Sequence, residues 1–329
     1  QLEEEIAAYT GAKYAVAAVS GTNALHMALL VSGIEAGNEV ITQAFSFVAT
    51  ANAIAYCSAY PIFIDVDQRT LGMSAKALEE FLKENARKES NGEVVNVRTG
   101  NRIHAVVPMH TFGFPCQIDQ IQKLCEEWGL VLIEDAAESL GSLYQGKHTG
   151  TFGDIGVYSF NGNKTITSGG GGVLLTNKEK YAISAKHLTT QAKVAHAWEF
   201  RHDSIGYNYR MPNINAALAC AQLEQLEGFV QAKRELASFY SRALGEIGIT
   251  FFKEPENCRS NYWLGAILLD DLKERDEFLE YSNSNGVMSR PAWNLLHTMP
   301  MFVNAQTDSL QNSKWIFDRL VNIPSSVIF

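Results

Sequence analysis

A single lysine, Lys164, lies between two apolar stretches in the run "SFNGNKTITSGGGGVLLTN", which extends from Ser159 to Asn177. A desolvated lysine amine can form a Schiff base with a carbonyl compound, whereas a solvent-facing lysine does no such chemistry. The four glycines at 169–172 leave room beside the chain, but a flexible surface loop would also contain them. Taken alone, the stretch leaves both interpretations open.

Two other polar segments follow apolar stretches. Asp135 ends "LVLIED", where a carboxylate must either meet a cation or cap the Ala-rich turn that follows. The segment Ser20–Thr22 opens a helical pattern, so its backbone N–H groups can hold a phosphate or simply start the helix. Each segment therefore has an ordinary structural explanation beside the chemical one.

Short β-branched runs alternate with helical patterns over the first two thirds of the chain. This alternation predicts an α/β fold with a mostly parallel sheet covered on both faces. Strands are expected at 14–20, 39–43, 60–67, 102–110, 130–135, 155–160 and 171–177, helices at 22–33, 48–57, 74–89 and 117–129, and a polar loop at 87–102. Because ligands bind at the carboxyl ends of parallel strands, Ser20–Thr22, Asp135 and Lys164 should meet there.

A smaller region follows. From about Asn213 the chain has one long helical pattern, in which Gly228 marks the expected bend, and then a strand and a helix. These last two elements are predicted at 261–269 and 272–286. The pattern predicts a large domain at 1–222 and a small C-terminal α/β domain at 223–329.

The composition limits the partners. The 329 residues carry a net charge of -9, which argues against nucleic acid or an anionic membrane while allowing a local basic pocket. No apolar run approaches the roughly 20 residues that span a bilayer. The five cysteines lack metal-ligand or disulfide-scaffold spacing, so we expect reduced thiols, no metal site and a cytoplasmic location. Because the chain starts at Gln1 and its last stretch, 322–329, resembles an internal strand, both ends are expected to be trimmed.

Together, the three polar segments match the contacts that pyridoxal 5′-phosphate (PLP) requires. Lys164 would bind the aldehyde, Asp135 would keep the pyridine nitrogen protonated, and the helix start at Ser20–Thr22 would hold the phosphate. Phe47 is either a face for the ring to stack on or a core residue. Three matching contacts at successive strand ends favour a PLP enzyme over three unrelated structural roles.

The order of motifs resembles the DegT/StrS family of nucleotide-sugar aminotransferases. The resemblance covers nearly the whole chain and is most specific in "EDAAES", "SFNGNK" and "GYNYRM". It implies PLP-dependent fold type I, which is aspartate-aminotransferase-like, and a homodimer. It also implies an amino-acid donor, expected to be glutamate, that converts PLP to its amino form (PMP), and a nucleotide-sugar acceptor.

The resemblance also implies roles for individual residues. Lys164 corresponds to the cofactor lysine, Asp135 to the partner of the pyridine nitrogen, and Phe47 to the stacking aromatic. Phosphate contacts are implied for Gly21, Thr22 and Ser159.

The block "GYNYRM" implies a contact between subunits. In the resembling family it crosses a two-fold interface, so Asn208 or Arg210 would reach the partner's cofactor phosphate or substrate. An ordinary loop within one chain is the alternative. The resemblance therefore implies a homodimer with shared active sites.

Glu138 departs from the commonest family pattern, which has Gln or His near the cofactor's ring oxygen. With "SFNGNK", it resembles the branch that aminates C4 of UDP-linked 4-keto-6-deoxy-N-acetylhexosamines, in legionaminic-acid and bacillosamine-type pathways of bacterial surface glycans. Two other activities are alternatives: a sugar dehydratase, whose members carry His in place of Lys164, and a non-catalytic sensor or scaffold. His110 could line the pocket, and Trp198 and Trp293 could pack or contact the sugar.

Overall fold

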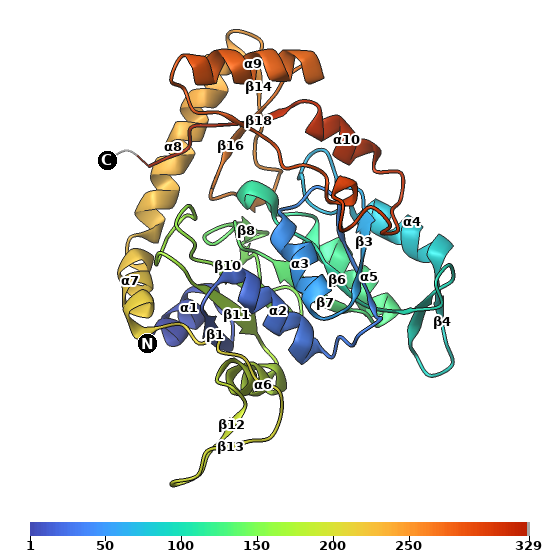
Figure 1. Cartoon of the computed structure of the whole chain (residues 1–329). Coiled ribbons are helices and arrows are strands. Elements are labelled where there is room, and N and C mark those ends of the chain that lie inside the picture. Colours follow the sequence, from blue (N-terminus) through green and yellow to red (C-terminus); the bar gives the residue numbers. More distant parts are fainter. Residues whose placement is uncertain (328–329) are drawn as a thin grey trace.

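Figure 1 shows the computed structural model, in which residues 1–327 are described. Within these residues the larger region is built on a nine-stranded sheet. Its main path is β1 (Tyr14–Ala18), β11 (Gly172–Thr176), β10 (Ile155–Ser159), β7 (Val131–Asp135), β6 (Arg102–Val107), β2 (Glu39–Gln43) and β3 (Tyr60–Ile64). The predicted α/β architecture is confirmed.

The sheet is mixed, although the pairings along its main path are mostly parallel, as predicted. Strands β10, β7, β6, β2 and β3 run parallel, but β11 is antiparallel to both of its neighbours, β10 and β1. The reason lies in the connection: β10 and β11 are joined by the 160–171 loop without a crossover helix, which parallel neighbours would need. The loop that carries Lys164 is therefore a turn between adjacent antiparallel strands.

Helices cover both faces of the sheet. One face packs on α2 (Gly21–Ser32), α3 (Val48–Tyr56) and α6 (Glu179–Thr189). The other packs on α4 (Ala75–Asn85) and α5 (Ile118–Trp128), and near β10 and β11 on α1 (Leu2–Thr10). Because both faces are covered, β2, β10 and β11 are buried along their whole length.

The segment predicted as a polar loop contains a hairpin. Strands β4 (Ala86–Lys88) and β5 (Val94–Asn96) pair antiparallel, and β5 also pairs antiparallel with the start of β6. The helix predicted at 74–89 therefore ends at Asn85. Polar residues occur where the hairpin is exposed, in β4 and the following turn, whereas Val94 and Asn96 of β5 are buried.

A second, four-stranded sheet forms the smaller region, at the top of Figure 1. Its order is β14 (Thr250–Phe251), β16 (Gly265–Leu268), β18 (Leu320–Ile323) and β17 (Arg290–Pro291). It is accompanied by α9 (Leu272–Ser284), η2 (Leu296–Thr298) and α10 (Gln311–Phe317). The strand predicted at 322–329 starts earlier and ends at Ile323, before Pro324, and residues 328–329 lie outside the described part.

The expected bend at Gly228 is wrong. Helix α7 (Asn213–Leu223) ends before Glu224, and α8 (Leu226–Gly245) contains Gly228. The break falls where α7 leaves α1 and α8 turns toward β14 of the smaller region. The proposed domain boundary at 222 lies in the last turn of α7, and the division into two domains stays a prediction.

Two further segments matter for the site. A three-stranded sheet joins the two regions through β8 (Leu143–Tyr144), β9 (Lys147–His148) and β15 (Cys258–Arg259). An arm made by β12 (Lys193–Val194) and β13 (Arg201–His202) projects from the body beside α6 (Figure 1). Among residues 1–327, no helix is both long and apolar enough to cross a membrane.

Candidate active site

The start of α2 forms one end of a cavity. Ser20 caps the helix, because its Oγ accepts a hydrogen bond from the Asn23 N–H at 3.1 Å. The first N–H groups of a helix have no partner within it, so they are available to an anion. This end of the cavity therefore has the donors and the dipole that a phosphate prefers.

Glycines allow α2 to start this close to the sheet. A Cβ on Gly21 would lie 2.8 Å from Ser159 Cβ, and one on Gly172 would lie 2.6 Å from the Gly21 nitrogen. Gly172 thus makes room for α2 rather than for a ligand, whereas Gly171 lines the cavity itself. The glycine run has a structural purpose that its position after Lys164 did not reveal.

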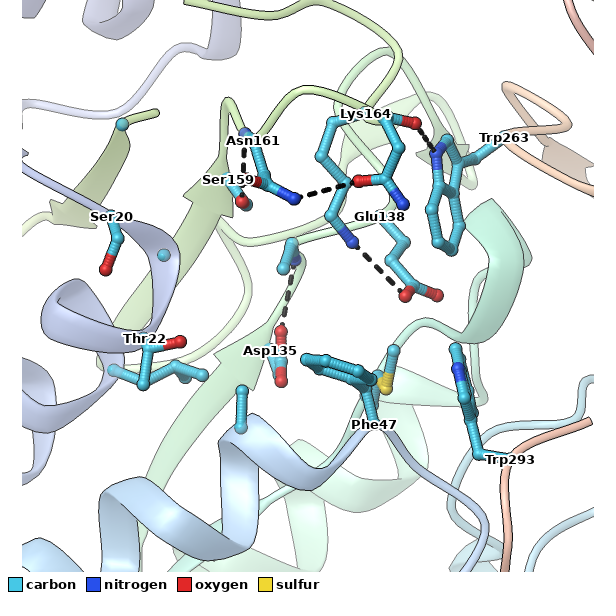
Figure 2. A pocket seen from close by; sticks show the side chains of 17 residues that line it. Ser20, Thr22, Phe47, Asp135, Glu138, Ser159, Asn161, Lys164, Trp263 and Trp293 are labelled. Carbon is cyan, nitrogen blue, oxygen red and sulfur yellow. Dashed lines mark hydrogen bonds and ion pairs between the residues drawn. The ribbon is translucent and has the colours of Figure 1, made fainter. Parts of the chain in front are cut away.

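Asp135 ends β7 and faces the cavity floor (Figure 2). Its carboxylate accepts hydrogen bonds from Thr50 Oγ1 at 2.6 Å and from the Ala137 N–H at 3.2 Å. Burial raises the pKa of Asp135 above its ordinary value, although both hydrogen bonds oppose that rise. A protonated pyridine nitrogen would be a cationic partner for this carboxylate and would favour its ionised form.

Lys164 points into the same cavity, next to a carboxyl and an indole. Its Nζ lies 3.3 Å from Glu138 Oε1 and 4.0 Å from the ring centroid of Trp263. Glu138 Oε2 accepts a hydrogen bond from the Phe112 N–H at 2.9 Å. Burial raises the pKa of Glu138 to about 7, even though the charge of Lys164 opposes the rise.

The cavity has a volume of 280 Å³. It is lined by most of the residues selected from the sequence: Gly21, Thr22, Phe47, Asp135, Glu138, Ser159 and Lys164. Figure 2 shows them around one space, with the exposed ring of Phe47 beside Asp135. The strand-end rule thus located the cavity correctly, while the role of each residue stays a prediction.

Asn208 and Arg210 do not line this cavity in their own chain. Both side chains are exposed. The backbone of Arg210 pairs with Ala18 at the end of β1, and that of Asn208 pairs with Thr190. The "GYNYRM" segment therefore runs along the surface beside the start of α2 without entering the site.

His110, expected as a lining candidate, is buried behind the site instead. Its Nε2 donates to Glu134 Oε2 at 2.9 Å, and its Nδ1 accepts from the Cys116 N–H at 3.2 Å. Glu134 also accepts three backbone N–H groups, from Gly150, Phe152 and Gly153, each at 2.7 Å. His110 is a structural residue that helps anchor the end of β7.

Two residues before β16 of the smaller region were missed. Asn261 is fully buried, and its amide donates to the backbone oxygens of Glu138 at 2.9 Å and Leu140 at 2.8 Å. Trp263 donates from its indole N–H to the Asn163 oxygen at 2.6 Å. The strand-end rule could not find them, because they precede a strand of a different sheet.

PLP fits the groups around this cavity. The Lys164 amine, the buried Asp135 carboxyl and the N-terminus of α2 face the same cavity. Phe47 offers an aromatic face to a bound ring. Among residues 1–327, no three His, Cys, Asp or Glu side chains are grouped closely enough to hold a metal ion. The arrangement supports carbonyl and amine chemistry at Lys164.

Comparisons with known proteins agree with this geometry. The family profile described as the DegT/DnrJ/EryC1/StrS aminotransferase family matches residues 1–328. EpsN of Bacillus subtilis (strain 168), provisionally named a pyridoxal phosphate-dependent aminotransferase, is 40% identical over 301 residues, covering 91% of this chain and 74% of that protein. A GDP-perosamine synthase of Escherichia coli O157:H7 is 38% identical over 302 residues, covering 92% and 78%.

Solved structures give the same result. PseC of Helicobacter pylori, an aminotransferase involved in the biosynthesis of pseudoaminic acid, matches with a TM-score of 0.89 and 25% identity, covering 99% of this chain and 85% of that one. The fold is therefore PLP-dependent fold type I, and PLP is the cofactor. With sequence similarity over nearly its whole length, the chain belongs to the DegT/DnrJ/EryC1/StrS aminotransferase family.

Proposed function

We propose that this enzyme transfers an amino group from glutamate to the C4 ketone of a nucleotide-linked 4-keto-6-deoxy sugar. Family membership makes it a PLP-dependent aminotransferase of nucleotide-linked keto sugars, so the proposal concerns the donor, the nucleotide and the carbon. The arrangement of Lys164, Asp135 and the start of α2 around one cavity supports the amino-transfer chemistry, and Glu138 beside Lys164 supports the choice of sugar.

Each residue of the site has a distinct task in this proposal. When bound, the cofactor supplies an electron-withdrawing ring that stabilises negative charge on the reacting carbon. Lys164 binds the cofactor and, once released, carries the proton between the two carbons that exchange it. Asp135 holds the ring nitrogen in its charged form, and the start of α2 holds the phosphate. Glu138, beside Lys164, would contact the ring oxygen.

For the nucleotide we propose UDP. Glu138 and the "SFNGNK" motif support this choice, because they resemble the branch that acts on UDP-linked N-acetylhexosamines. Three of the relatives are GDP-perosamine synthases, among them those of Escherichia coli O157:H7 and Vibrio cholerae, so a GDP-linked sugar is the competing candidate. Both nucleotides therefore belong in the test.

The test is a substrate panel. The enzyme is incubated with ¹⁵N-glutamate and with UDP-, GDP- or dTDP-linked 4-keto-6-deoxy sugars, and the product is identified by mass and NMR. We expect ¹⁵N at C4 of the UDP-linked sugar. Label at another carbon, or a UDP-sugar turned over more slowly than its GDP counterpart, would contradict the corresponding part of the proposal.

A separate measurement tests the lysine. Borohydride reduction of the holoenzyme should fix the cofactor on Lys164, as read by peptide mass spectrometry. Lys164→Ala should lower turnover by several orders of magnitude, because it removes both the cofactor bond and the proton carrier. Another lysine that lines neither the cavity nor its rim, Lys123, supplies the control substitution. Cofactor found on any other lysine would overturn the assignment.

We also propose a homodimer with shared active sites. Lys164 is the one cationic side chain among the described residues that line the cavity, so a bound diphosphate and phosphate would lack counter-charges. The arm beside α6 and the segment that follows it expose Trp198, Phe200 and Ile205, which are 80%, 83% and 84% exposed. A second copy would cover this apolar surface, and the exposed Arg210 or Asn208 could then reach its cavity.

Subunit mixing tests the shared site. Lys164→Ala and Arg210→Ala subunits, each inactive alone, are mixed and allowed to exchange. In every mixed dimer one site then has both groups intact, so partial activity should return. Full activity of a demonstrated monomer, or no rescue after verified exchange, would contradict the proposal.

We place the enzyme in the cytoplasm. All five cysteines are free, and four of them are buried, which fits a reducing compartment.

A further inference from the structure

Trp263 forms an apolar wall at the reacting end of the cavity. Its side chain comes from the smaller region, and the residue is 5% exposed. Its ring centroid lies 4.0 Å from Lys164 Nζ, so whatever approaches that nitrogen also approaches the indole. Figure 2 shows the ring directly beside the lysine, above Glu138.

The polar atom of Trp263 is already used. The indole N–H donates to the Asn163 oxygen at 2.6 Å. Its backbone is held too, because its N–H donates to Asn261 Oδ1 at 2.8 Å and its oxygen accepts from Lys233 Nζ at 3.2 Å. The wall is therefore fixed in place and presents only carbon atoms to a ligand.

In a ring ketone, the substituents on the two carbons adjacent to the ketone lie close to the side chains around Lys164. Lys164 must come within hydrogen-bond reach of the carbon that receives the amino group. Substituents on the two adjacent ring carbons then lie roughly 2.5 Å from that carbon. Lys164 Nζ contacts the Glu138 carboxyl on one side and the face of Trp263 on another, and Asn161 and Asn163 also line the cavity. A methyl group on one adjacent carbon fits the face of Trp263, and a hydroxyl on the other fits the polar side of the cavity.

We propose that Trp263 is a specificity-determining residue, which selects sugars carrying a methyl group, rather than a hydroxymethyl group, on the carbon beside the ketone. This inference rests on the proposed function. A hydroxymethyl oxygen would lose its water and meet an indole face that has no donor left to offer it. A methyl group has no hydrogen bond to water to lose, and burying it against the indole ring is favourable.

The experiment compares two substrates. The holoenzyme is given a pair of nucleotide-linked 4-keto sugars that differ only at C6, one with CH3 and one with CH2OH, on whichever nucleotide supports turnover. The kcat/KM for the methyl sugar should exceed that for the hydroxymethyl sugar by roughly 10–100-fold, the range expected for a hydrophobic pocket. Calorimetric Kd values, measured without an amino donor, should differ in the same direction.

Two variants assign the effect to Trp263. Trp263→Phe keeps an apolar wall but loses the hydrogen bond to Asn163, so the preference should persist even if overall activity falls. Trp263→His offers a polar ring atom, so the preference should fall to less than about a third of the wild-type ratio. Trp293→His is the matched control on the other aromatic wall, which stands beside Phe47, and it should leave the ratio unchanged.

The outcomes separate this inference from the function on which it rests. If the wild-type enzyme aminates no keto sugar, the proposed function fails. If it aminates both sugars equally, or if Trp263→His keeps the full preference while remaining folded and loaded with cofactor, the role of Trp263 fails alone. An equal loss of preference in Trp263→Phe and Trp263→His would also overturn it, because positioning rather than apolar contact would then be responsible.

Discussion

Two adjacent carboxyl groups at the end of β7 face opposite sides of the sheet and have opposite surroundings. Glu134 accepts four hydrogen bonds, from three backbone N–H groups and from His110, and every one of them is 2.9 Å or shorter. Asp135 accepts two, one of which is 3.2 Å long, and burial raises its pKa. Both residues are buried, so burial alone does not distinguish them.

The difference separates a structural carboxylate from a functional one. Four donors are about as many as a carboxylate can accept, so Glu134 has no capacity left for a ligand. Asp135 has unfilled acceptor sites on a cavity wall, so burying its charge costs free energy unless a cationic partner is bound. The number of hydrogen bonds that each carboxylate accepts, rather than its charge or its burial, therefore distinguishes the ligand-binding residue from the structural one.

The largest effect is expected from Glu134→Gln. The amide can no longer accept from all four donors, and its own NH2 faces some of them. We expect the free energy of unfolding to fall by roughly 2–6 kcal/mol, because the amide nitrogen leaves two of the four buried donors unpaired and each costs about 1–3 kcal/mol. Urea denaturation measures it. A variant as stable as the wild type would show that Glu134 is not the structural carboxylate of the pair.

The same chemical change one residue later should affect activity instead. Asp135→Asn removes the charge that holds the pyridine nitrogen protonated, so kcat should fall by roughly 10²–10³-fold, as for loss of one preorganised electrostatic group. Cofactor affinity should change much less, because the phosphate contacts remain. Stability should not fall, since the raised pKa shows that the buried charge opposes folding. Near-normal kcat would refute the assignment.

Glu138 extends the comparison to pH. Its pKa is raised from 4.5 to about 7, so between these values the folded protein binds a proton that the unfolded chain has lost. The resulting stabilisation is complete below pH 4.5 and disappears as the pH rises through 7, and it amounts to about 3 kcal/mol. Denaturation of cofactor-free protein across this range should show the wild type losing stability relative to Glu138→Gln. Parallel curves would contradict the raised pKa.

Thr50 offers the smallest and most specific change. Its hydroxyl donates to Asp135 at 2.6 Å, a bond that lowers the pKa of that carboxyl. Thr50→Val should raise the pKa of Asp135 and move the acidic limb of the pH–activity profile upward by up to about one pH unit, since such a bond contributes roughly 0.5–1.5 kcal/mol. Thr50→Ser keeps the hydroxyl and is the control. Identical profiles for the two variants would count against a role for this bond.

The parallel part of the fold followed from the sequence because its signals are local. Apolar runs such as 39–43 and 155–160 alternate with helical patterns, and the rule for strand ends then placed Asp135 and Lys164 at one edge. The antiparallel β11 escaped prediction because periodicity does not tell the direction of a strand. The sign of its antiparallel direction in the sequence is the short glycine-rich connection from β10, which contains no helix.

The residues that the sequence did not reveal come from long-range packing. Asn261 and Trp263 reach the site from a loop about 100 residues after Lys164, and no spacing rule connects the two. His110 could line the cavity because it follows a strand end, but its side chain turns toward Glu134. Strand ends limit where a residue lies, whereas side-chain direction depends on the partners it finds.

Asn261 also couples the two sheets energetically. Its amide reaches the segment that contains Glu138, its N–H donates to Ser142 Oγ, and the adjacent Ser260 donates to the Gly113 oxygen. Detaching the smaller region would leave these buried groups without partners, so the two sheets should melt in a single cooperative transition. Hydrogen exchange would then show one common opening event, and the smaller region would serve as a fixed wall of the site rather than as a hinged lid.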